Sequence, residues 1–380
     1  MASEMLYPIM PIYLKTIGFS VVLIGVLEGL AEATAGLSKG YFGKLSDMSG
    51  KRVPFVRIGY AFSSISKPMM AVFIFPIWIF FARTIDRIGK GIRTGARDAI
   101  LSDEATPETK GTVFGLHRSM DTLGAVLGPA LALLYLYHYP QQYKALFYIA
   151  FIPGLLAVLT TFLLKEKMKS KPINKVSTPF FSFLHYWKVS PTAYRKLVTG
   201  LLIFTLFNSS DVFLLLKAKQ AGLTDTMVIG VYIFYNLVFA LCALPVGILA
   251  DKLGLKRIFV FGLGIFAIVY FGMSVSTNLY LFFALFFLYG IYASATEGIS
   301  KAWISNISSP TDTATAIGTY SGLQSICTML ASSFTGLIWY TFGASAAFIT
   351  TGIASVLVML YILTIPPPHK EIKIAADNIQ

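Results

Sequence analysis

The stretch Gly43-Lys44-Leu45-Ser46-Asp47-Met48-Ser49-Gly50-Lys51-Arg52 follows an apolar run that is long enough to cross a membrane. Its glycines permit a tight turn, and the Asp47 carboxylate can cap or face a helix N-terminus. Lys51 and Arg52 add positive charge, which collects in loops on the inner side of a membrane. The stretch therefore predicts a short cytoplasmic turn between two spanning helices.

A degenerate copy of this pattern lies in the second half of the chain. Two separate blocks of residues recur there with offsets that agree within one residue, which predicts two structurally equivalent halves in parallel orientation. A shift of 204 residues places Gly43, Asp47 and Gly50 on Gly247, Asp251 and Gly254, and a shift of 203 places Gly95, Ser102, Pro107, Thr112 and Gly115 on Gly298, Ser305, Pro310, Thr315 and Gly318.

The composition predicts an all-α polytopic membrane protein. Of the 380 residues, 56% are hydrophobic and 13% are charged, with a mean hydropathy of +0.70, which excludes a soluble globular protein. A span takes about 20 residues, so the length allows roughly eleven to thirteen helices. The apolar runs predict twelve, over residues 1–16, 21–43, 55–75, 77–100, 112–138, 144–164, 197–217, 226–249, 257–275, 279–303, 313–340 and 344–365.

The net charge of +13 is explained by the loops rather than by nucleic-acid binding, which we do not expect. Basic residues collect in alternate connections, so the positive-inside rule predicts that these loops and both termini are cytoplasmic in an inner or plasma membrane. The polar stretch 165–196 predicts a linker between helix bundles at 1–164 and 197–365, and 366–380 predicts a cytoplasmic tail. The basic connections contain Lys44, Lys51, Arg52 and Arg57, then Lys165 through Lys175, then Lys252, Lys256 and Arg257.

These features resemble the major facilitator superfamily over nearly the whole chain. The stretch 43–52 looks like the superfamily's signature loop between helices 2 and 3, and 247–254 looks like its copy between helices 8 and 9. The resemblance implies twelve helices in two six-helix bundles and a loop that clamps the halves in one conformational state. Met48 stands where the family usually has a basic residue. The implied gating residues are Gly43, Asp47, Gly50, Arg52, Gly247, Asp251 and Gly254.

Two further motifs extend the resemblance. Arg83 matches the buried arginine of the superfamily's helix-4 motif, which is associated with proton coupling. Gly124-Ala125-Val126-Leu127-Gly128-Pro129 resembles the helix-5 motif of exporters that exchange drug for proton, and it implies a gating role for Gly124, Gly128 and Pro129. Ala132 and Leu133 replace the two closing glycines of that motif, which weakens an antiporter assignment.

Ionisable residues inside predicted spans are the main candidate site, because a charge in a bilayer usually faces a cavity or a partner. In the fourth span, Arg83, Asp86 and Arg87 share one face with further cations. Carboxylates on the second and fifth spans can balance this charge, so we expect an ionic network among these three helices. The candidates for this network and for proton coupling are Glu28, Glu32, Arg83, Asp86, Arg87, His117 and Asp121.

A second set of residues predicts a substrate cavity. Superposing residues 2–4 on 209–211 suggests that Glu4 and Asp211 are equivalent in the two halves. Helix 7 has about a dozen apolar residues before Asp211, whereas Glu4 lies at the start of the sequence, so we expect a short first helix and further residues before Met1. The cavity candidates are Glu4, Asn208, Asp211, Asn236, Glu297 and Gln324.

The sequence predicts a secondary active transporter, without a metal, a cofactor or an enzymatic activity. No Gly-Lys pair is followed by Ser or Thr as in an ATP-binding loop, and the four histidines are scattered. The preferred hypothesis is proton-coupled antiport or efflux of a small organic solute by a monomer in the lipid bilayer. The alternatives are symport or exchange of an anionic metabolite, and a non-transporting membrane receptor or intramembrane enzyme.

Overall fold

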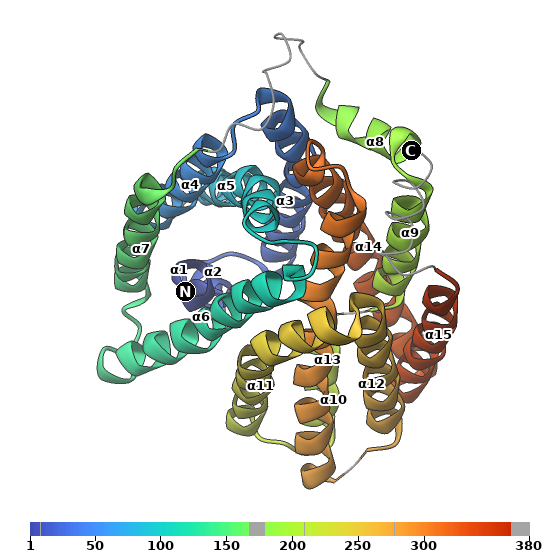
Figure 1. Ribbon diagram of the computed structural model, residues 1–380. Coiled ribbons are helices and arrows are strands. Elements are labelled where there is room, and N and C mark those ends of the chain that lie inside the picture. Colours follow the sequence, from blue (N-terminus) through green and yellow to red (C-terminus); the bar gives the residue numbers. More distant parts are fainter. Residues whose placement is uncertain (8, 167–178, 209, 277, 366–380) are drawn as a thin grey trace, which may run out of the picture. The chain divides into compact units, whose positions relative to one another are not determined.

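The computed structural model describes residues 1–7, 9–166, 179–208, 210–276 and 278–365, and within these ranges the chain forms helices and connecting turns without a β-strand (Figure 1). The helices are α1 (Ala2–Leu6), α2 (Met10–Thr16), α3 (Val21–Ser49), α4 (Val53–Val72), α5 (Pro76–Asp103), α6 (Lys110–His138), α7 (Tyr143–Thr160), α8 (Tyr186–Val189), α9 (Thr192–Phe207), α10 (Val212–Gln220), α11 (Asp225–Leu253), α12 (Leu255–Val275), α13 (Leu279–Ile307), α14 (Thr313–Phe342) and α15 (Ala344–Thr364). Short 3-10 turns lie at Thr161–Leu163 (η1) and Phe180–His185 (η2).

Polar residues between the apolar runs set several helix starts. The Ser20 hydroxyl accepts a hydrogen bond from the backbone N–H of Leu23, at 3.1 Å, and so caps α3. Thr224 caps α11 in the same way through Met227, and Asn278 caps α13 through Tyr280. Each cap satisfies a backbone donor that has no partner in the first turn of a helix.

Two predicted helices are interrupted. The predicted helix over 1–16 is divided into α1, which ends at Leu6, and α2, which begins at Met10. The predicted helix over 197–217 is divided into α9 and α10, with Asn208 and Asp211 at the ends of the break. Short polar side chains of this kind compete for backbone groups and favour helix ends.

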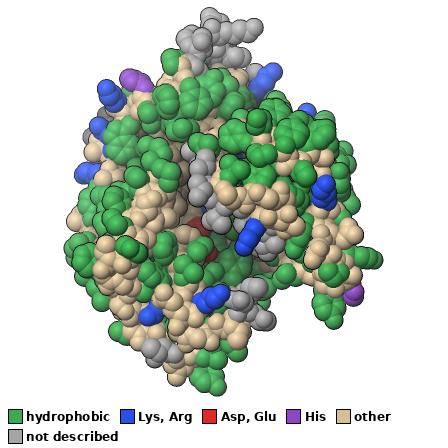
Figure 2. All heavy atoms as spheres, turned by 180° about the vertical axis from the view of Figure 1, so that it is seen from behind, with side chains coloured by type: hydrophobic (Ala, Val, Ile, Leu, Met, Phe, Trp, Pro, Cys, Tyr) green, Lys and Arg blue, Asp and Glu red, His purple; other side chains and the backbone are tan. Residues whose placement is uncertain are grey.

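Seven of the described helical segments are long and apolar enough to cross a membrane. The predicted runs over 21–43, 55–75, 77–100 and 313–340 are also helical, as α3, α4, α5 and α14, but these helices carry more charged and hydroxyl-bearing residues. The count of twelve spans stays a prediction. Figure 2 shows hydrophobic side chains over most of the displayed face, as expected for a surface in contact with lipid. The seven segments are Lys110–His138, Tyr143–Leu163, Thr192–Gln220, Gly230–Leu253, Leu255–Val275, Leu279–Ile307 and Ala344–Thr364.

The contacts within the chain divide it into two compact units, and each unit combines segments that are distant in sequence. Unit 1 contains residues 1–100, 123–189 and 309–325, and unit 2 contains residues 101–122, 190–308 and 326–380. The first part of α6 thus belongs to unit 2 and the first part of α14 to unit 1. The predicted bundles at 1–164 and 197–365 follow the sequence order, and that division stays a prediction.

Each unit has its own apolar core. In unit 1, α7 packs against α4 and α1, and Tyr13, Leu146 and Phe147 are among the buried residues of one cluster. In unit 2, α12 lies between α13 and α15, and α11 packs on α13 (Figure 1). Buried aromatic rings such as Phe266 and Tyr270 are in contact there, with centroids 4.2 Å apart.

The crossing of α11 with the first turns of α6 requires a glycine at 247, because a Cβ at that position would collide with the carbonyl oxygen of Gly111. We expect Gly247→Val to lower the free energy of unfolding by about 1–3 kcal/mol, as overpacking usually does. The measurement is thermal unfolding of the purified protein in detergent. Gly230→Ala on the same helix is the control, since a Cβ there meets no atom within 4 Å. Equal melting temperatures for the two variants would contradict this account.

Candidate functional site

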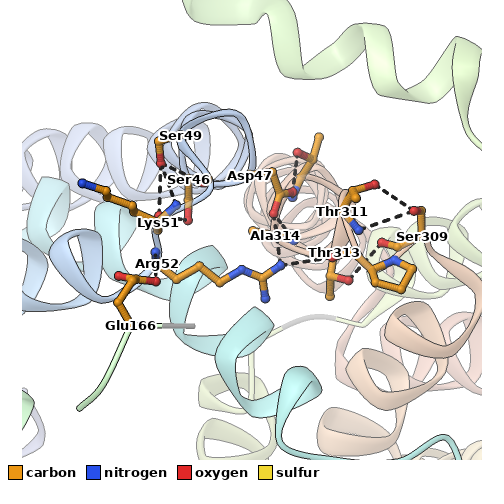
Figure 3. Close-up of polar contacts among 12 residues, drawn as sticks. Ser46, Asp47, Ser49, Lys51, Arg52, Glu166, Ser309, Thr311, Thr313 and Ala314 are labelled. Carbon is orange, nitrogen blue, oxygen red and sulfur yellow. Dashed lines mark hydrogen bonds and ion pairs between the residues drawn. The ribbon is translucent and has the colours of Figure 1, made fainter. Parts of the chain in front are cut away.

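The carboxylate of Asp47, near the end of α3, binds the N-terminus of α14 (Figure 3). Asp47 Oδ2 accepts hydrogen bonds from the backbone N–H and the hydroxyl of Thr315, both at 2.7 Å, and Oδ1 accepts one from the N–H of Ala314 at 3.4 Å. A Cβ at Gly43 would collide with the carbonyl of Ala314, so the glycine allows the two helices to approach. Asp47 therefore caps a helix that starts 266 residues later in the chain.

Arg52 connects this capping contact to the turn between α3 and α4. Its guanidinium lies 3.4 Å from Asp47 Oδ1 and donates to the carbonyl of Pro310 at 3.2 Å. Gly50 ends α3 in the left-handed conformation, with φ +65°. The carboxylate of Glu166 accepts the N–H groups of Arg52 and Val53, both at 2.9 Å (Figure 3). Glu166 was missed by the sequence reasoning, because nothing in its neighbourhood marks it as the cap of α4.

Asp251, the repeat-related residue at the end of α11, binds the N-terminus of α6 in the same way. Its Oδ1 accepts the N–H of Gly111 at 2.7 Å, and its Oδ2 accepts the N–H and the hydroxyl of Thr112 at 2.7 and 2.6 Å. Gly254 follows α11 with φ +99°, which favours glycine. The two capping contacts thus use the same residue types at equivalent positions of the two sequence halves.

Burial raises the pKa of the Asp47 carboxyl to about 7, while the hydrogen bonds from Thr315 and the charge of Arg52 act in the opposite direction. Asp47 lies beyond the predicted span over 21–43, in the last turn of α3. A carboxyl with a raised pKa holds a proton in the folded chain that the unfolded chain releases. Its contribution to stability is therefore complete at low pH and is lost as the pH rises through about 7.

We expect Asp47→Asn to reduce the change in melting temperature that accompanies acidification from about pH 8 to about pH 5, because the amide keeps an acceptor for the Thr315 N–H but does not titrate. The measurement is thermal unfolding of wild type and variant across this range. Asp47→Ala is the comparison, since it removes the cap and should be destabilised at every pH. An unchanged pH dependence in Asp47→Asn would assign the titration to another group.

A cluster of charged residues joins α4 and α5 in unit 1, and we call it the basic cluster: the buried Lys67, Arg83, Asp86 and Arg87, and the half-buried Lys90. Lys67 Nζ lies 2.7 Å from Asp86 Oδ1 and also donates to the Ser3 hydroxyl at 3.0 Å. Arg83 approaches the other oxygen of Asp86 at 3.6 Å. One carboxylate therefore serves two cations, and the Ser63 hydroxyl donates to it as well.

The acids predicted to balance this charge lie at the edge of the cluster. Glu32 of α3 pairs with Arg87 at 3.3 Å, and its side chain is half exposed. Glu4 of α1 is half-buried and, with Glu32, attracts the Lys90 ammonium. The side chain of Glu28 lies outside the described part of the structure. Lys90 is one of the further cations expected on this face of the fourth span, whereas the pairing of Lys67 with Asp86 was missed by the sequence reasoning.

We expect Asp86→Asn to be more destabilising than Lys67→Met, because Asp86→Asn removes the charge that faces two buried cations, whereas loss of Lys67 leaves Asp86 with Arg83. Removing one partner of a buried ion pair typically costs about 3–5 kcal/mol. Thermal unfolding of the two single variants and of the double variant measures the difference. A melting temperature of Asp86→Asn at or above that of Lys67→Met would be incompatible with this assignment.

The other predicted charges form a separate cluster in unit 2. Asp121 pairs with Arg118 of its own helix α6, at 3.5 Å, and Arg118 also pairs with Glu297 of α13, at 3.1 Å. Residues 101–122 belong to unit 2, and the expected ionic network between Asp121 and the fourth span stays a prediction. His117 is half-buried, one turn before Asp121 on the same helix.

The break between α9 and α10 is lined by polar and aromatic groups of unit 2. Asp211 accepts a hydrogen bond from the Tyr235 hydroxyl, and Asn208 Nδ2 donates to the Tyr292 hydroxyl at 3.0 Å. Asn236 is buried on α11, and its side chain donates to the carbonyl of Tyr232. This cluster joins three of the predicted cavity residues, whereas Glu297 lies with Arg118, and Gln324 lies half-buried on α14 in unit 1.

The remaining motif residues pack helices together. A Cβ at Gly124 would collide with the backbone nitrogen of Met1, and one at Gly128 with that of Met5, so α6 and α1 are in close contact in unit 1. Pro129 is buried within α6. Among the described residues, no group of three His, Cys, Asp or Glu side chains is arranged to hold a metal ion.

A family model of the Major Facilitator Superfamily matches residues 1–235 and 218–379 of the sequence. The chain belongs to the major facilitator superfamily. It is therefore an all-helical, multi-pass membrane protein of a family of secondary transporters, and the resemblance seen in the sequence is confirmed.

Relatives within the major facilitator superfamily cover most of the chain. An uncharacterized MFS-type transporter of Methanocaldococcus jannaschii is 33% identical over 345 residues, which are 89% of this chain and 85% of the relative. A second one from the same organism is 27% identical over 281 residues, 71% and 70% of the two chains.

Solved superfamily structures share the fold. The human organic anion transporter TETRAN superposes with a TM-score of 0.79 and 16% identity, and 95% of each chain is covered. The fucose:proton symporter of Escherichia coli superposes with a TM-score of 0.71 and 12% identity, and 96% of this chain and 95% of that chain are covered. At these identities the likeness concerns the fold.

Proposed function

We propose that this protein moves a small organic anion across the membrane by alternating access, with the basic cluster as part of its binding site. The observation that carries the proposal is the excess of buried positive charge on α4 and α5. Lys67, Arg83 and Arg87 are each less than a tenth exposed, and Asp86 is the buried carboxylate that faces them.

An unbalanced buried charge is costly, and the cost falls when a counter-ion is present. A bound carboxylate or phosphate would supply that counter-ion. The planar guanidinium groups of Arg83 and Arg87 are suited to it, because each can donate two parallel hydrogen bonds to an anion.

Lys90 is the strongest candidate for direct contact with the anion. It is half-buried on α5, one turn after Arg87, and its ammonium makes no hydrogen bond or close ion pair with any described side chain. The attraction of Glu32 and Glu4 acts on it over a longer distance. A half-buried ammonium without a direct partner is stabilised when an anion binds next to it.

The name of the human structural neighbour, an organic anion transporter, indicates the same substrate class. At 16% identity this is support by analogy, and the charges of the basic cluster carry the argument. The proposed anion site therefore rests on the charges of the basic cluster.

The two capping contacts are proposed to control access. Asp47 joins the first sequence half to Thr315 of the second, and Asp251 joins the second half to Thr112 of the first. Breaking both contacts would release the two helix N-termini from the opposite sequence halves. We propose that they hold the cytoplasmic side closed and separate when the transporter opens to that side, in two bundles over 1–164 and 197–365.

Proton-coupled exchange of a solute is the second candidate, and the Glu32–Arg87 pair favours it. Glu32 is half exposed while its partner Arg87 is buried, so a proton can reach the carboxyl when the pair separates. The same pair would also allow an anion to compete with Glu32 for Arg87. Neutralising Glu32 should therefore alter the pH profile of transport if a proton is coupled.

We expect Lys90→Gln to raise the KM for an anionic substrate about tenfold or more, because a hydrogen bond to a charged group is typically worth about 1.5–3 kcal/mol. The assay is uptake by proteoliposomes of a panel of organic anions with neutral analogues. Lys144→Gln, an exposed lysine of α7, is the matched control and should keep the wild-type KM.

An imposed pH gradient separates the two candidates in the same assay. Anion transport that needs no gradient supports anion exchange, and solute movement driven against the proton gradient supports antiport. Transport of neutral or cationic solutes at a rate that Lys90→Gln does not change would contradict the anion proposal.

A further inference from the structure

A cavity of about 670 Å³ lies in unit 2, and its lining includes no residue of the basic cluster or of either break in the helices. It is formed where α11 is followed by α12 and where α13 and α15 end, and Pro107 and Glu108, just before α6, complete its wall. Every residue that lines it belongs to unit 2. The cavity is therefore defined by one compact unit.

The charges in this cavity are mainly positive. Lys252, Lys256 and Arg257 line it, together with the carboxylates of Glu108 and Asp251. The Asp251 carboxylate already accepts three hydrogen bonds from Gly111 and Thr112, at 2.6 to 2.7 Å. Because its oxygens already accept these hydrogen bonds, the Asp251 carboxylate is less able to pair with a neighbouring lysine.

Two of the three cations are available to a ligand. Lys256 is held in place, because its ammonium donates to the carbonyls of Leu363 and Ile365 at the end of α15, at 2.7 and 2.5 Å. Lys252 and Arg257 are exposed, and neither side chain makes a hydrogen bond or an ion pair within the described ranges of the chain. They lie on either side of Gly254, whose lack of a side chain leaves the first turn of α12 without a side-chain cap.

The position of the cavity relative to the membrane narrows the choice of ligand. Four candidate spans begin or end at its wall, at Leu253, Leu255, Ile307 and Thr364. The positive-inside rule predicts that these helix ends are cytoplasmic, because the connection between α11 and α12 carries Lys252, Lys256 and Arg257. Leu253 and Leu363 add apolar surface and are each about half exposed. A cationic cavity with an apolar wall at the boundary of the bilayer fits a headgroup with its first acyl carbons.

We propose that this cavity binds a phosphate group, with Lys252 and Arg257 as its ligands. The phosphate can come from an anionic phospholipid of the inner leaflet or from a soluble phosphate ester, and both present the same anion to the two side chains. The cavity contains no residue of the basic cluster, so this proposal is independent of the transported substrate.

The test uses the full chain reconstituted in nanodiscs of phosphatidylcholine alone or with phosphatidylglycerol. We expect phosphatidylglycerol to raise the melting temperature and native mass spectrometry to detect the retained lipid. Lys252→Gln together with Arg257→Gln should weaken binding about thirtyfold, since each cation near a membrane surface contributes roughly fivefold. Folding should be kept, because neither side chain has a partner to lose.

The control is Arg195→Gln together with Lys196→Gln, which removes the same two charges from exposed residues of α9 in unit 2 and should bind like wild type. A separate arm adds inorganic phosphate or glycerol 3-phosphate to protein in phosphatidylcholine. Protection in that arm, lost in the double variant, assigns the site to a soluble phosphate. Phosphatidylglycerol binding that is unchanged in the double variant, equal loss in the control, or no binding in either arm would overturn the proposal.

Discussion

Asp47 and Asp251 each place a carboxylate against the N-terminus of a helix from the other half of the sequence, at Thr315 and Thr112. The first N–H groups of a helix have no partner within it and carry partial positive charge, so a carboxylate there satisfies both the hydrogen bonds and the dipole. Glycines at 43 and 247 let the backbones come close enough for these bonds. Each capping contact lies within one of the two compact units, and each unit combines segments that are distant in the chain.

A second constraint comes from charge placed inside apolar surroundings. Helix α5 carries cations along a face that a simple spanning helix would fill with apolar residues, and its carboxylate Asp86 pairs with Arg83 of the same helix and with Lys67 of α4. Such an arrangement is stable only when every charge has a partner or can obtain one. The remaining positive charge is the basis for the proposed binding of an anion, whereas the charges of α6 and α13 pair with each other through Arg118.

Most of the helices could be predicted from the sequence, because a span must be long and apolar and its ends must be polar. The exceptions have physical causes. The break between Asn208 and Asp211 lies within a run that is otherwise apolar, so the sequence predicted one continuous helix. Helix α9 begins at Thr192, before the predicted residue 197, because Pro191 and a polar first turn are acceptable at a helix end near water. Glu166 caps α4 from a segment that is distant in sequence, and no local sequence pattern predicts a capping residue of this kind.

The sequence by itself determined the membrane-spanning class, the family and the repeat. Through the repeat it identified two pairs of equivalent positions, Asp47 with Asp251 and Thr112 with Thr315. These features depend on local composition and on the spacing of residues. Only the tertiary structure decided which carboxylate meets which helix, that Arg118 pairs with both Asp121 and Glu297, and that Lys67 shares Asp86 with Arg83. Hydrogen bonds and ion pairs act over a few ångströms, so their partners are set by the packing of helices and not by the order of residues along the chain.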